Sequence, residues 1–444
     1  MNLEQLKRGE KKVGVWGTGY IGFTTMANFA KNGVQCIGYD ISEKIVNTIN
    51  SGKPPVPNLE YWLGFDVEPL VRAGLIKATT NLEEIINKDV IVHFIAVPTE
   101  KNDEPWDDAL IDVTQKLCRI KEFNTDPPLV IIESTLTPYR TDNVVIPILE
   151  KAGLKVGKDI YVGVAPRRDW FISPEKNLKV LPRVFGGTTK ETTELMRNVL
   201  SLICDNLVPA PDHRHAEIVK GIENAYRHME ITLANQLSLA YPDLDMTEIL
   251  RLVGTKWNMG TYYPSFGTGG YCIPLASKYV ISGTKYPQNL TLLNETIKFD
   301  SKMPIIVAES LIKRGAKNVG ILGLAYKGDL KVHILSPTIK IVRLLKERGV
   351  NVKVHDPYYT EEEIKKIVDV ETFSYPEGLK EFDTILIVAG HLLYKSTPEK
   401  VLIENLKNCR LILDNLEKAW RRIDFSKYGI KYYVAGESGW LVTS

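Results

Sequence analysis

The stretch KVGVWGTGYIG, residues 12–22, decides the fold of the N-terminal half of the chain. It is a short apolar run that ends in the glycine pattern GxGxxG. Residues 20–32 continue with the apolar spacing of a helix, and a second apolar run over 34–39 ends at Asp40. This order of strand, glycine turn, helix, strand and acidic residue predicts a parallel α/β unit that binds a dinucleotide.

Each glycine of the pattern has a separate physical purpose. Gly17 permits a tight turn, and Gly19 lets the backbone approach a pyrophosphate at the positive N-terminus of the helix. Gly22 permits close packing of helix against strand. The predicted cofactor-binding residues of this motif are Gly17, Gly19, Tyr20, Ile21 and Gly22.

Asp40 favours NAD over NADP. It lies 23 residues after Gly17, where a carboxylate can accept hydrogen bonds from the ribose hydroxyls of the adenosine. Its negative charge would repel a 2′-phosphate, and the following residues Ile41-Ser42-Glu43 supply no arginine to bind one. We therefore expect NAD as the cofactor.

Outward from this motif, buried strands alternate with helices along the chain. Further strands are expected at 90–97, 129–133 and 161–164, then at 319–324, 350–355, 384–388 and 410–414. Such continuous apolar runs suit parallel sheets that are covered on both faces. One long helix is expected at 213–241, a glycine- and aromatic-rich loop at 254–271, and helices at 292–314 and 337–348.

The predicted fold class is therefore α/β, with two Rossmann-like parallel-sheet domains joined by a long central helix. The predicted domains are an NAD-binding domain at 1–210, a central helical region at 211–314 and a C-terminal α/β domain at 315–444. The second α/β half has Gly320, Gly323 and Gly328 but no GxGxxG, and its second strand ends in His355-Asp356. A Rossmann-like fold without a dinucleotide is favoured there, and binding of another nucleotide group stays open.

Composition excludes several classes of protein. With 56 Lys+Arg and 54 Asp+Glu the net charge is +2, which argues against a general nucleic-acid binder. No apolar run is long enough to span a bilayer, and the N-terminus does not resemble a signal peptide. The five cysteines are scattered without CxxC spacing, so we expect a cytoplasmic protein with reduced thiols and no metal site.

The stretch GTGGYCIP, residues 267–274, is the second informative motif. Gly267, Gly269 and Gly270 let a ligand approach the backbone and expose amide N–H groups to anions. A thiol held in such a loop, here Cys272, is placed for covalent chemistry on a carbonyl. The other four cysteines fall in predicted strands or helices and are interpreted as small buried apolar residues.

Lys220 and Asn224 form a third candidate pair. They are four residues apart on the predicted long helix and so share one face. A lysine and an amide together can stabilise a developing oxyanion. On spacing alone, however, a solvated helix face is the favoured interpretation.

Together these motifs resemble the UDP-glucose/GDP-mannose dehydrogenase family, over nearly the whole chain and in order. Other matching segments are Val97-Pro98-Thr99, Glu133-Ser134-Thr135, Ala325-Tyr326-Lys327 and Ser336-Pro337. The chain looks closest to the UDP-N-acetylhexosamine (ManNAc/GlcNAc) 6-dehydrogenases. The segment 223–227, and Ile273 where the glucose enzymes usually have Phe, carry that closer similarity.

The resemblance implies oxidation of a sugar C6 alcohol to a carboxylate with two NAD. Cys272 would form a thiohemiacetal and then a thioester, Lys220 and Asn224 would stabilise oxyanions, and Thr135 would position water. Lys327 would contact the diphosphate of a nucleotide sugar, Arg227 would also bind substrate, and Pro98 and Thr99 would contact the cofactor. The resemblance also implies a homodimer formed through the central helix, and no nucleic-acid or membrane partner.

The chain departs from the family at usual catalytic carboxylates. Arg167 stands where the family has Glu, and Ala276 stands where it has Asp. Other departures are Asn258 and Ile334 for arginines and Ser265-Phe266 for Gly-Pro. Arg167 with Arg168 would bind an extra anionic group of the substrate or form a surface pair. Three hypotheses follow: a working 6-dehydrogenase, a divergent enzyme with an unusual substrate or incomplete oxidation, and, least favoured, a non-catalytic NAD-fold sensor.

Overall fold

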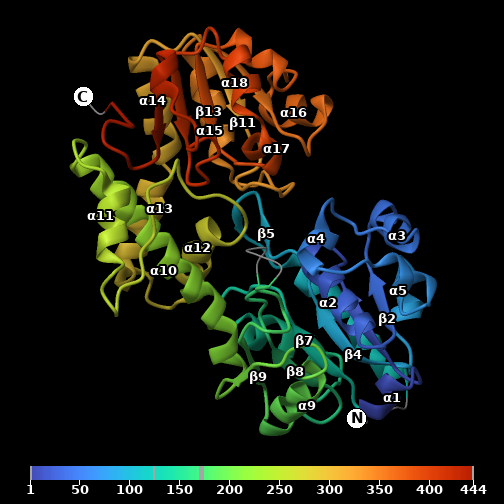
Figure 1. Cartoon of the computed structure of the whole chain (residues 1–444). Coiled ribbons are helices and arrows are strands. Elements are labelled where there is room, and N and C mark those ends of the chain that lie inside the picture. The colour runs from blue at the N-terminus through green and yellow to red at the C-terminus, as the bar shows by residue number, and fades with distance from the viewer. Residues whose placement is uncertain (1–2, 124–125, 170–174, 443–444) are drawn as a thin grey trace. The chain divides into compact units, whose positions relative to one another are not determined.

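The computed structural model describes residues 3–123, 126–169 and 175–442 (Figure 1). Two compact units make up the chain: unit 1 comprises residues 1–223 and 278–285, and unit 2 comprises residues 224–277 and 286–444. The first division falls within the long helix α10 (His213–Ala240). The predicted domain boundaries near residues 210 and 314 stay a prediction.

Unit 1 contains an eight-stranded sheet with the order β10-β9-β8-β7-β4-β1-β2-β3. Neighbouring strands are parallel except β8 and β9, so the predicted parallel α/β architecture is confirmed with one antiparallel step. The strands are β1 (Lys12–Trp16), β2 (Cys36–Tyr39), β3 (Ile76–Thr79), β4 (Val90–Ile95), β7 (Leu129–Ile132), β8 (Tyr161–Val164), β9 (Arg183–Gly187) and β10 (Leu207–Pro209). A short hairpin is formed by β5 (Glu100–Lys101) and β6 (Glu104–Pro105).

Helices cover both faces of this sheet because its strands are apolar on both sides. In β1, Val13 and Val15 belong to one buried core, and Trp16 belongs to the core on the opposite face. The helices of unit 1 include α1 (Leu3–Lys7), α2 (Tyr20–Lys31), α3 (Glu43–Asn50), α4 (Leu59–Leu63), α5 (Glu68–Arg72), α6 (Leu82–Ile85), α7 (Asp108–Leu117), α8 (Ile146–Lys151) and α9 (Lys190–Leu200). The continuous apolar runs of the sequence thus have a direct structural counterpart.

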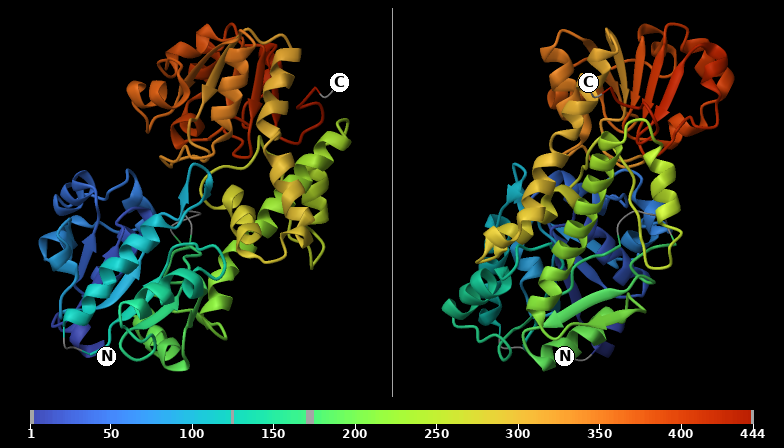
Figure 2. Two further views of the ribbon diagram at one scale, coloured as in Figure 1. Left: turned by 180° about the vertical axis from the view of Figure 1, so that it is seen from behind. Right: turned by 90° about the vertical axis from the view of Figure 1, so that its left-hand side faces the viewer.

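Unit 2 contains a five-stranded parallel sheet with the order β12-β11-β13-β14-β15 (Figure 2). The strands are β11 (Asn318–Leu322), β12 (Asn351–His355), β13 (Thr384–Ile387), β14 (Leu411–Asp414) and β15 (Lys431–Val434). The helices include α11 (Met246–Val253), α13 (Thr291–Asp300), α14 (Met303–Lys313), α15 (Pro337–Glu347), α16 (Glu361–Val368), α17 (Leu392–Ser396) and α18 (Glu399–Asn405). Four of these strands were predicted, and β15 was not, because its sequence KYYV carries no continuous aliphatic run.

Helix α12 (Ile273–Gly283) was missed by the sequence analysis, which placed the next helix only at residue 292. It begins directly after Cys272, and Pro274 occupies its second position. A proline fits the first turn of a helix because its missing N–H has no intrahelical partner there. The candidate nucleophile is therefore fixed at the start of a helix, where a free loop was expected.

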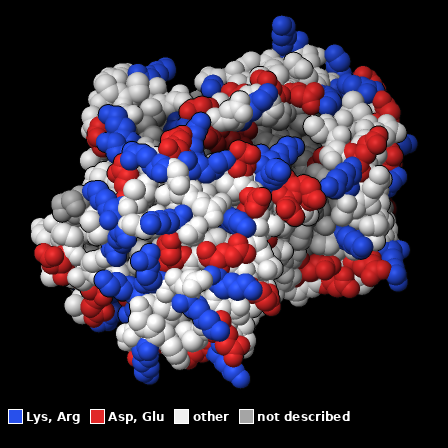
Figure 3. Space-filling model, turned by 90° about the horizontal axis from the view of Figure 1, so that it is seen from above, with Lys and Arg blue, Asp and Glu red and all other residues white. Residues whose placement is uncertain are grey.

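Charged side chains of both signs are intermixed on the face drawn in Figure 3, in keeping with the near-zero net charge. Among the described residues, no helix combines the length and apolar character required to cross a membrane. No group of three or more His, Cys, Asp or Glu side chains in the described ranges is arranged to hold a metal ion.

Candidate active site

The glycine turn between β1 and α2 has the shape that a pyrophosphate site requires. Gly17 has a left-handed φ of +83°, and a Cβ there would lie 2.7 Å from the Ala96 carbonyl oxygen. A Cβ on Gly22 would lie 1.8 Å from the Gly17 carbonyl oxygen, whereas a Cβ on Gly19 would have nothing within 4 Å. Helix α2 has no side-chain cap at Gly19, so its first N–H groups face an open position that suits an anion.

Asp40 holds this turn in place from the end of β2. Its Oδ2 accepts hydrogen bonds from Thr18 N (2.9 Å) and Thr18 Oγ1 (3.0 Å), and its Oδ1 accepts one from Ser42 N (3.0 Å). The side chain is half-buried. A carboxylate accepts about four hydrogen bonds, so Asp40 retains capacity for a ribose hydroxyl.

The loops that follow β4 and β7 are joined at Thr99. The Thr99 hydroxyl donates to the carbonyl oxygen of Thr135 (2.6 Å), and Tyr279 Oη donates to the carbonyl oxygen of Thr99 (2.9 Å). Thr99 is buried, Thr135 is half-buried and Pro98 is exposed. The structure thus brings the predicted residues Thr99 and Thr135 together beyond the carboxyl ends of β4 and β7.

Lys220 and Asn224 do not lie on a solvated helix face, so that interpretation was wrong. Their exposed fractions are 8% and 3%. Glu217, one turn earlier on α10, is also buried and accepts hydrogen bonds from Arg140 N (2.7 Å), Thr141 N (3.3 Å) and Thr141 Oγ1 (2.5 Å). Burial raises the pKa of Glu217 to about 7. Helix α10 therefore presents a buried polar stripe, which the sequence analysis recognised only in part although helical spacing would have extended it to Glu217.

Cys272 differs from the other four cysteines. The thiols of Cys36, Cys118, Cys204 and Cys409 each donate to a backbone carbonyl oxygen, and burial raises the pKa of all four. Cys272 is half-buried, and its own carbonyl oxygen accepts a hydrogen bond from Ala276 N (3.2 Å) in the first turn of α12. The structure thus distinguishes one cysteine at a helix start from four that pack within the fold.

The glycines before Cys272 make room for a neighbouring loop of unit 2. A Cβ on Gly269 would lie 2.5 Å from Tyr326 Cβ, and one on Gly270 would lie 2.6 Å from Tyr326 Cε1. Gly270 N donates to the carbonyl oxygen of Ile334 (2.8 Å). The expectation that these glycine amides are open to anions is therefore wrong for Gly270. Gly267 has a φ of +113°, a conformation that favours glycine.

Buried polar side chains hold the segment before these glycines. Ser265 N donates to Asn235 Oδ1 (2.7 Å), Phe266 N donates to Asn415 Oδ1 (3.2 Å), and Thr268 N donates to Asp300 Oδ1 (3.0 Å). Phe266 also stacks on Trp440, with ring centroids 6.1 Å apart. The sequence analysis did not find Asn235, Asn415 or Asp300, and only Asn235 carried a signal, since it continues the polar spacing of α10.

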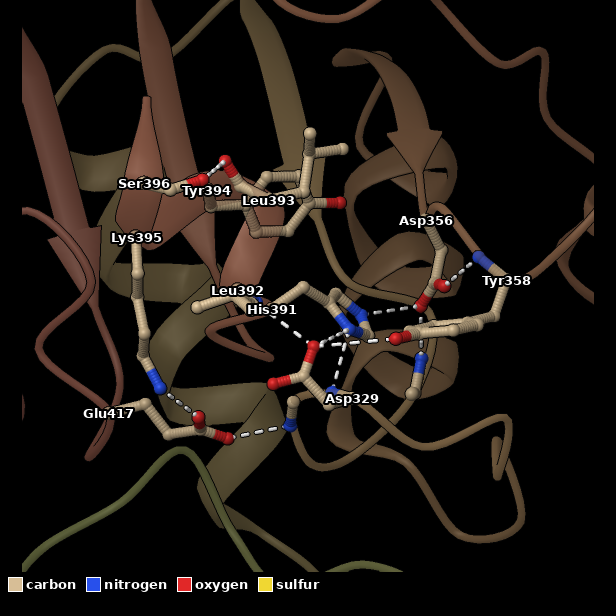
Figure 4. A network of polar contacts seen from close by, with 12 residues as sticks. Asp329, Asp356, Tyr358, His391, Leu392, Leu393, Tyr394, Lys395, Ser396 and Glu417 are labelled. Atoms are coloured by element: carbon tan, nitrogen blue, oxygen red, sulfur yellow. Dashed lines mark hydrogen bonds and ion pairs between the residues drawn. The ribbon is translucent and has the colours of Figure 1, made fainter. Parts of the chain in front are cut away.

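Lys327 lies in a group of like and unlike charges in unit 2. Burial lowers its pKa, and Arg227 and Lys395 lower it further, while Glu417 raises it. Glu417 accepts hydrogen bonds from Gly328 N (2.6 Å) and Lys395 Nζ (2.7 Å), the latter drawn in Figure 4. Asp329 also raises this pKa, so three cations lie close to two carboxylates and form a site of net positive charge that fits a diphosphate.

Asp356, directly after β12, has its hydrogen bonds with groups of the protein. Its Oδ2 accepts hydrogen bonds from Leu324 N and Ala325 N (both 2.9 Å) and lies 3.1 Å from His391 Nε2 (Figure 4). Asp329 N donates to His391 Nδ1 (2.9 Å), so Nε2 carries the proton that His391 shares with Asp356. Both side chains are fully buried.

Arg167 is neither a surface residue nor part of a surface pair. All five of its N–H donors have partners: the two carboxylate oxygens of Asp169 at 2.7 and 2.6 Å, the hydroxyls of Thr24 and Thr25, and the carbonyl oxygen of Ile21. Arg168 points elsewhere and pairs with Glu223 at 2.6 Å. A contact of Arg167 with substrate stays a prediction, and it would require the ion pair with Asp169 to open.

Three family models match the chain, and each describes a part of the UDP-glucose/GDP-mannose dehydrogenase family. The NAD binding domain matches residues 11–203, the central domain residues 214–301, and the UDP binding domain residues 320–417. The NAD binding match covers most of the sheet of unit 1, the central match covers the helices that follow it, and the UDP binding match covers most of the sheet of unit 2.

Individual proteins are similar over almost the whole chain. The UDP-N-acetyl-D-mannosamine dehydrogenase of Methanococcus aeolicus is 28% identical over 437 residues, which cover 93% of each chain. The UDP-N-acetyl-D-glucosamine 6-dehydrogenase of Pseudomonas aeruginosa is 26% identical, with 87% of this chain and 92% of that protein covered. Among solved structures, a UDP-D-ManNAc dehydrogenase from Pyrococcus horikoshii superposes with a TM-score of 0.80 and 26% identity, covering 96% of this chain and all of that one.

Proposed function

The chain belongs to the UDP-glucose/GDP-mannose dehydrogenase family, and from that premise we propose that it oxidises the C6 alcohol of a UDP-sugar to a carboxylate. The observation that carries the proposal is the buried polar stripe of α10. Lys220 and Asn224 are held out of water, where a cation and an amide stabilise a developing oxyanion far better than on an exposed face.

NAD is the cofactor, and it supplies the hydride acceptor for each oxidation. The residues of unit 1 fit it, because the position beside Gly19 is open and Asp40 has acceptor capacity left. The N–H groups at the start of α2 would bind the pyrophosphate. Asp40 would bind the adenosine ribose, and Thr99 would hold the loop after β4 against the loop that carries Thr135.

Cys272 is the proposed nucleophile. The first oxidation turns the C6 alcohol into an aldehyde, and the Cys272 thiolate adds to that carbonyl to give a thiohemiacetal. Loss of a second hydride gives a thioester on Sγ. Water then cleaves the thioester and releases the carboxylate and the free thiol. Lys220 and Asn224 would stabilise the oxyanions of the addition and hydrolysis steps, and Thr135 would position the water.

The proposed substrate is a UDP-N-acetylhexosamine or a UDP-hexose. Relatives of this chain are named as UDP-N-acetyl-D-mannosamine and UDP-N-acetyl-D-glucosamine dehydrogenases, and the C-terminal match is to a UDP binding domain. Lys327, Arg227 and Lys395 would neutralise the diphosphate.

A second candidate is a divergent enzyme that stops at the aldehyde or the thioester, or that takes an unusual substrate. Ala276 and Arg167 favour it, because neither can serve as an acid or a base near neutral pH. General acid–base help is typically worth 10²–10⁴-fold, so thioester hydrolysis without it would be slow.

We also propose a homodimer through α10. Tyr226 and Leu233 on this helix are 61% and 53% exposed, and large apolar side chains on one helix suit a contact with a second copy. Light scattering of the purified protein would test this, and a monomer at micromolar concentration would contradict it.

The central experiment incubates the protein with NAD and a panel of UDP-ManNAc, UDP-GlcNAc, UDP-glucose and GDP-mannose. NADH is measured by absorbance, and the sugar product and Cys272 adducts are measured by mass spectrometry. We expect two NADH per sugar and a uronate product with one of the UDP-sugars. Cys272→Ser is expected to abolish uronate formation, and Cys118→Ser, the other half-buried cysteine, serves as the control.

The outcomes separate the candidates. One NADH per sugar, or a lasting thioester on Cys272, would support the divergent enzyme. Absence of NADH with every member of the panel would count against the working 6-dehydrogenase and against incomplete oxidation of these sugars, and would favour an enzyme for an unusual substrate or an NAD-fold sensor.

A further inference from the structure

His228 is a buried titratable residue that the proposed mechanism does not use. It follows Asn224 by four residues on α10 and is 1% exposed, so it continues the stripe of Lys220 and Asn224. A buried imidazole has a strong requirement for hydrogen-bond partners. Its two neighbours, Ser277 and Asp300, come from the two helices that follow Cys272 in the sequence.

The imidazole lies between a hydroxyl and a carboxylate. His228 Nδ1 is 3.0 Å from Ser277 Oγ, and His228 Nε2 is 3.3 Å from Asp300 Oδ2. The contact with Ser277 is a hydrogen bond, whereas Nε2 meets the Asp300 carboxylate at close range without the geometry of a hydrogen bond. Ser277 lies on α12 and Asp300 ends α13.

Asp300 connects the imidazole to the glycine loop. Its Oδ1 accepts from Thr268 N (3.0 Å), and its Oδ2 accepts from Thr268 Oγ1 (2.6 Å). Thr268 stands four residues before Cys272, and Ser277 stands five residues after it. The four side chains therefore join α10, α12, α13 and the glycine loop, and they hold the Cys272 segment from both ends.

We propose that Ser277, His228, Asp300 and Thr268 form a chain of polar contacts, here named the cysteine brace, that positions Cys272 for its reaction with substrate. Hydrogen bonds join Ser277 to His228 and Thr268 to Asp300, and a close contact of 3.3 Å joins His228 to Asp300. This inference rests on the proposed function, in which Cys272 is the nucleophile. Position 276, where the family has an aspartate, holds a 1% exposed alanine, so the brace supplies the buried carboxylate and imidazole that support this segment. Its members are positioning residues that act through the geometry of the Cys272 backbone.

Thr268→Val is the decisive variant, because Thr268 is half-exposed and valine keeps its shape while it removes the hydroxyl. Thr268→Ser keeps the donor to Asp300. Thr255→Val is the matched control: Thr255 is exposed, and its hydroxyl donates to the carbonyl oxygen of Leu252 (2.7 Å). Asp300→Asn tests the same link from the other side, since an amide has one acceptor oxygen where the carboxylate uses two.

Two readouts are required. The first is the rate at which iodoacetamide alkylates Cys272, followed by peptide mass spectrometry without any sugar; the second is kcat and KM with the UDP-sugar. For Thr268→Val we expect at least a fivefold change in the alkylation rate, and a tenfold lower kcat with KM within twofold. Thr268→Ser and Thr255→Val are expected within twofold of the wild type in both. Thermal unfolding verifies that each variant is folded.

The proposal is overturned if folded Thr268→Val reacts at Cys272 and turns over substrate as the wild type does, whatever the effect of Asp300→Asn. It is also overturned if Thr268→Ser is as impaired as Thr268→Val, since the hydroxyl would then not be the cause. If no sugar is oxidised, the proposed function fails while the alkylation rates still test the brace.

Discussion

The two Rossmann-like halves begin with a similar strand and glycine turn but differ in the helix start that follows the turn. In unit 1, β1 leads through Gly17 into α2, and in unit 2, β11 leads through Gly323 into α15. Both glycines have left-handed φ values, +83° and +103°, and a Cβ on either would lie 2.6–2.7 Å from backbone at the end of the next strand in the sheet. In both halves an aspartate at the end of the second strand accepts N–H groups of the loop after the first.

The two halves differ in which helix N–H groups and carboxylate oxygens remain available to bind a ligand. Helix α2 begins three residues after Gly17 without a side-chain cap, whereas α15 begins fourteen residues after Gly323, with Ser336 as its cap and Pro337 at its start. Asp40 is half-buried, while Asp356 is fully buried against His391. The first turn and the aspartate after the second strand are shared, but only the first half leaves helix N–H groups and carboxylate capacity for a dinucleotide.

The largest effect that would break this comparison is expected from Asp356→Ala. It removes the acceptor of Leu324 N, Ala325 N and the His391 imidazole in a fully buried position, which typically costs about 3–5 kcal/mol. Urea unfolding would measure the loss. Asp40→Ala is the matched control and is expected to cost roughly 1 kcal/mol, because Thr18 and Ser42 regain water. If both variants lost the same free energy of unfolding, the two aspartates would have the same structural role.

Stability should also depend on pH through one buried carboxyl group in each half. Burial raises the pKa of Glu217 in unit 1 and of Asp414 in unit 2 to about 7, from 4.5 and 3.8. Between the ordinary pKa of each group and about pH 7, the group is protonated in the folded state and ionised in the unfolded state. The free energy of unfolding therefore falls as the pH rises to about 7, and it stays constant above that pH. For Glu217 the linkage amounts to roughly 3 kcal/mol at 1.36 kcal/mol per pKa unit.

Urea unfolding of the wild type, Glu217→Gln and Asp414→Asn at pH 5, 6, 7 and 8 tests this prediction. Each variant is expected to lose less stability between pH 5 and 7 than the wild type, because it lacks one of the two buried carboxyl groups that hold a proton in the folded state. A wild type that gains stability over this range would contradict the raised pKa values.

Much of this arrangement was readable from the sequence. The glycine pattern, the second strand and Asp40 indicate the dinucleotide half through local chemistry, and the missing GxGxxG distinguishes the second half, which matches a UDP binding domain. Partners far apart in sequence were not readable. Asp300 lies 72 residues from His228 in the sequence, and the fold brings their side chains to 3.3 Å.

Arg167 shows the same limit. The sequence identified the departure from the family's glutamate, but it contained no information that the guanidinium would be used by Asp169 and two threonines of α2. Helix α12 was missed because the glycines and aromatics of 254–271 predict a loop, and the one local signal of a helix start, Pro274 in its first turn, was not used.

A smaller effect is expected from Gly19→Ala, which sharpens the comparison at the turn. Its Cβ would meet no protein atom within 4 Å, so the thermal unfolding temperature should stay within about 2 °C of the wild type. The methyl group would occupy the side from which a pyrophosphate approaches, and we expect NAD to bind roughly 10–100-fold more weakly. Calorimetric titration with NAD measures this, with Gly260→Ala as the control for adding a methyl group, because a Cβ there also meets nothing within 4 Å and the φ of Gly260 is not left-handed. Unchanged NAD affinity would mean that the open position is not the pyrophosphate site.

The smallest effect is expected from Asp40→Asn. The amide keeps one acceptor oxygen for Thr18 but loses the charge, so NAD should bind about tenfold more weakly, and NADP should gain relative to NAD because the repulsion of a 2′-phosphate is removed. Titration of both cofactors against the wild type measures this change of ratio. Asp66→Asn is the control, since Asp66 is exposed in the same unit and also accepts a backbone N–H, from Glu68. If Asp40→Asn destabilises the folded protein and leaves the ratio of the NAD and NADP affinities unchanged, Asp40 has the structural role of Asp356. The availability of the first half for a dinucleotide would then rest on the start of α2 alone.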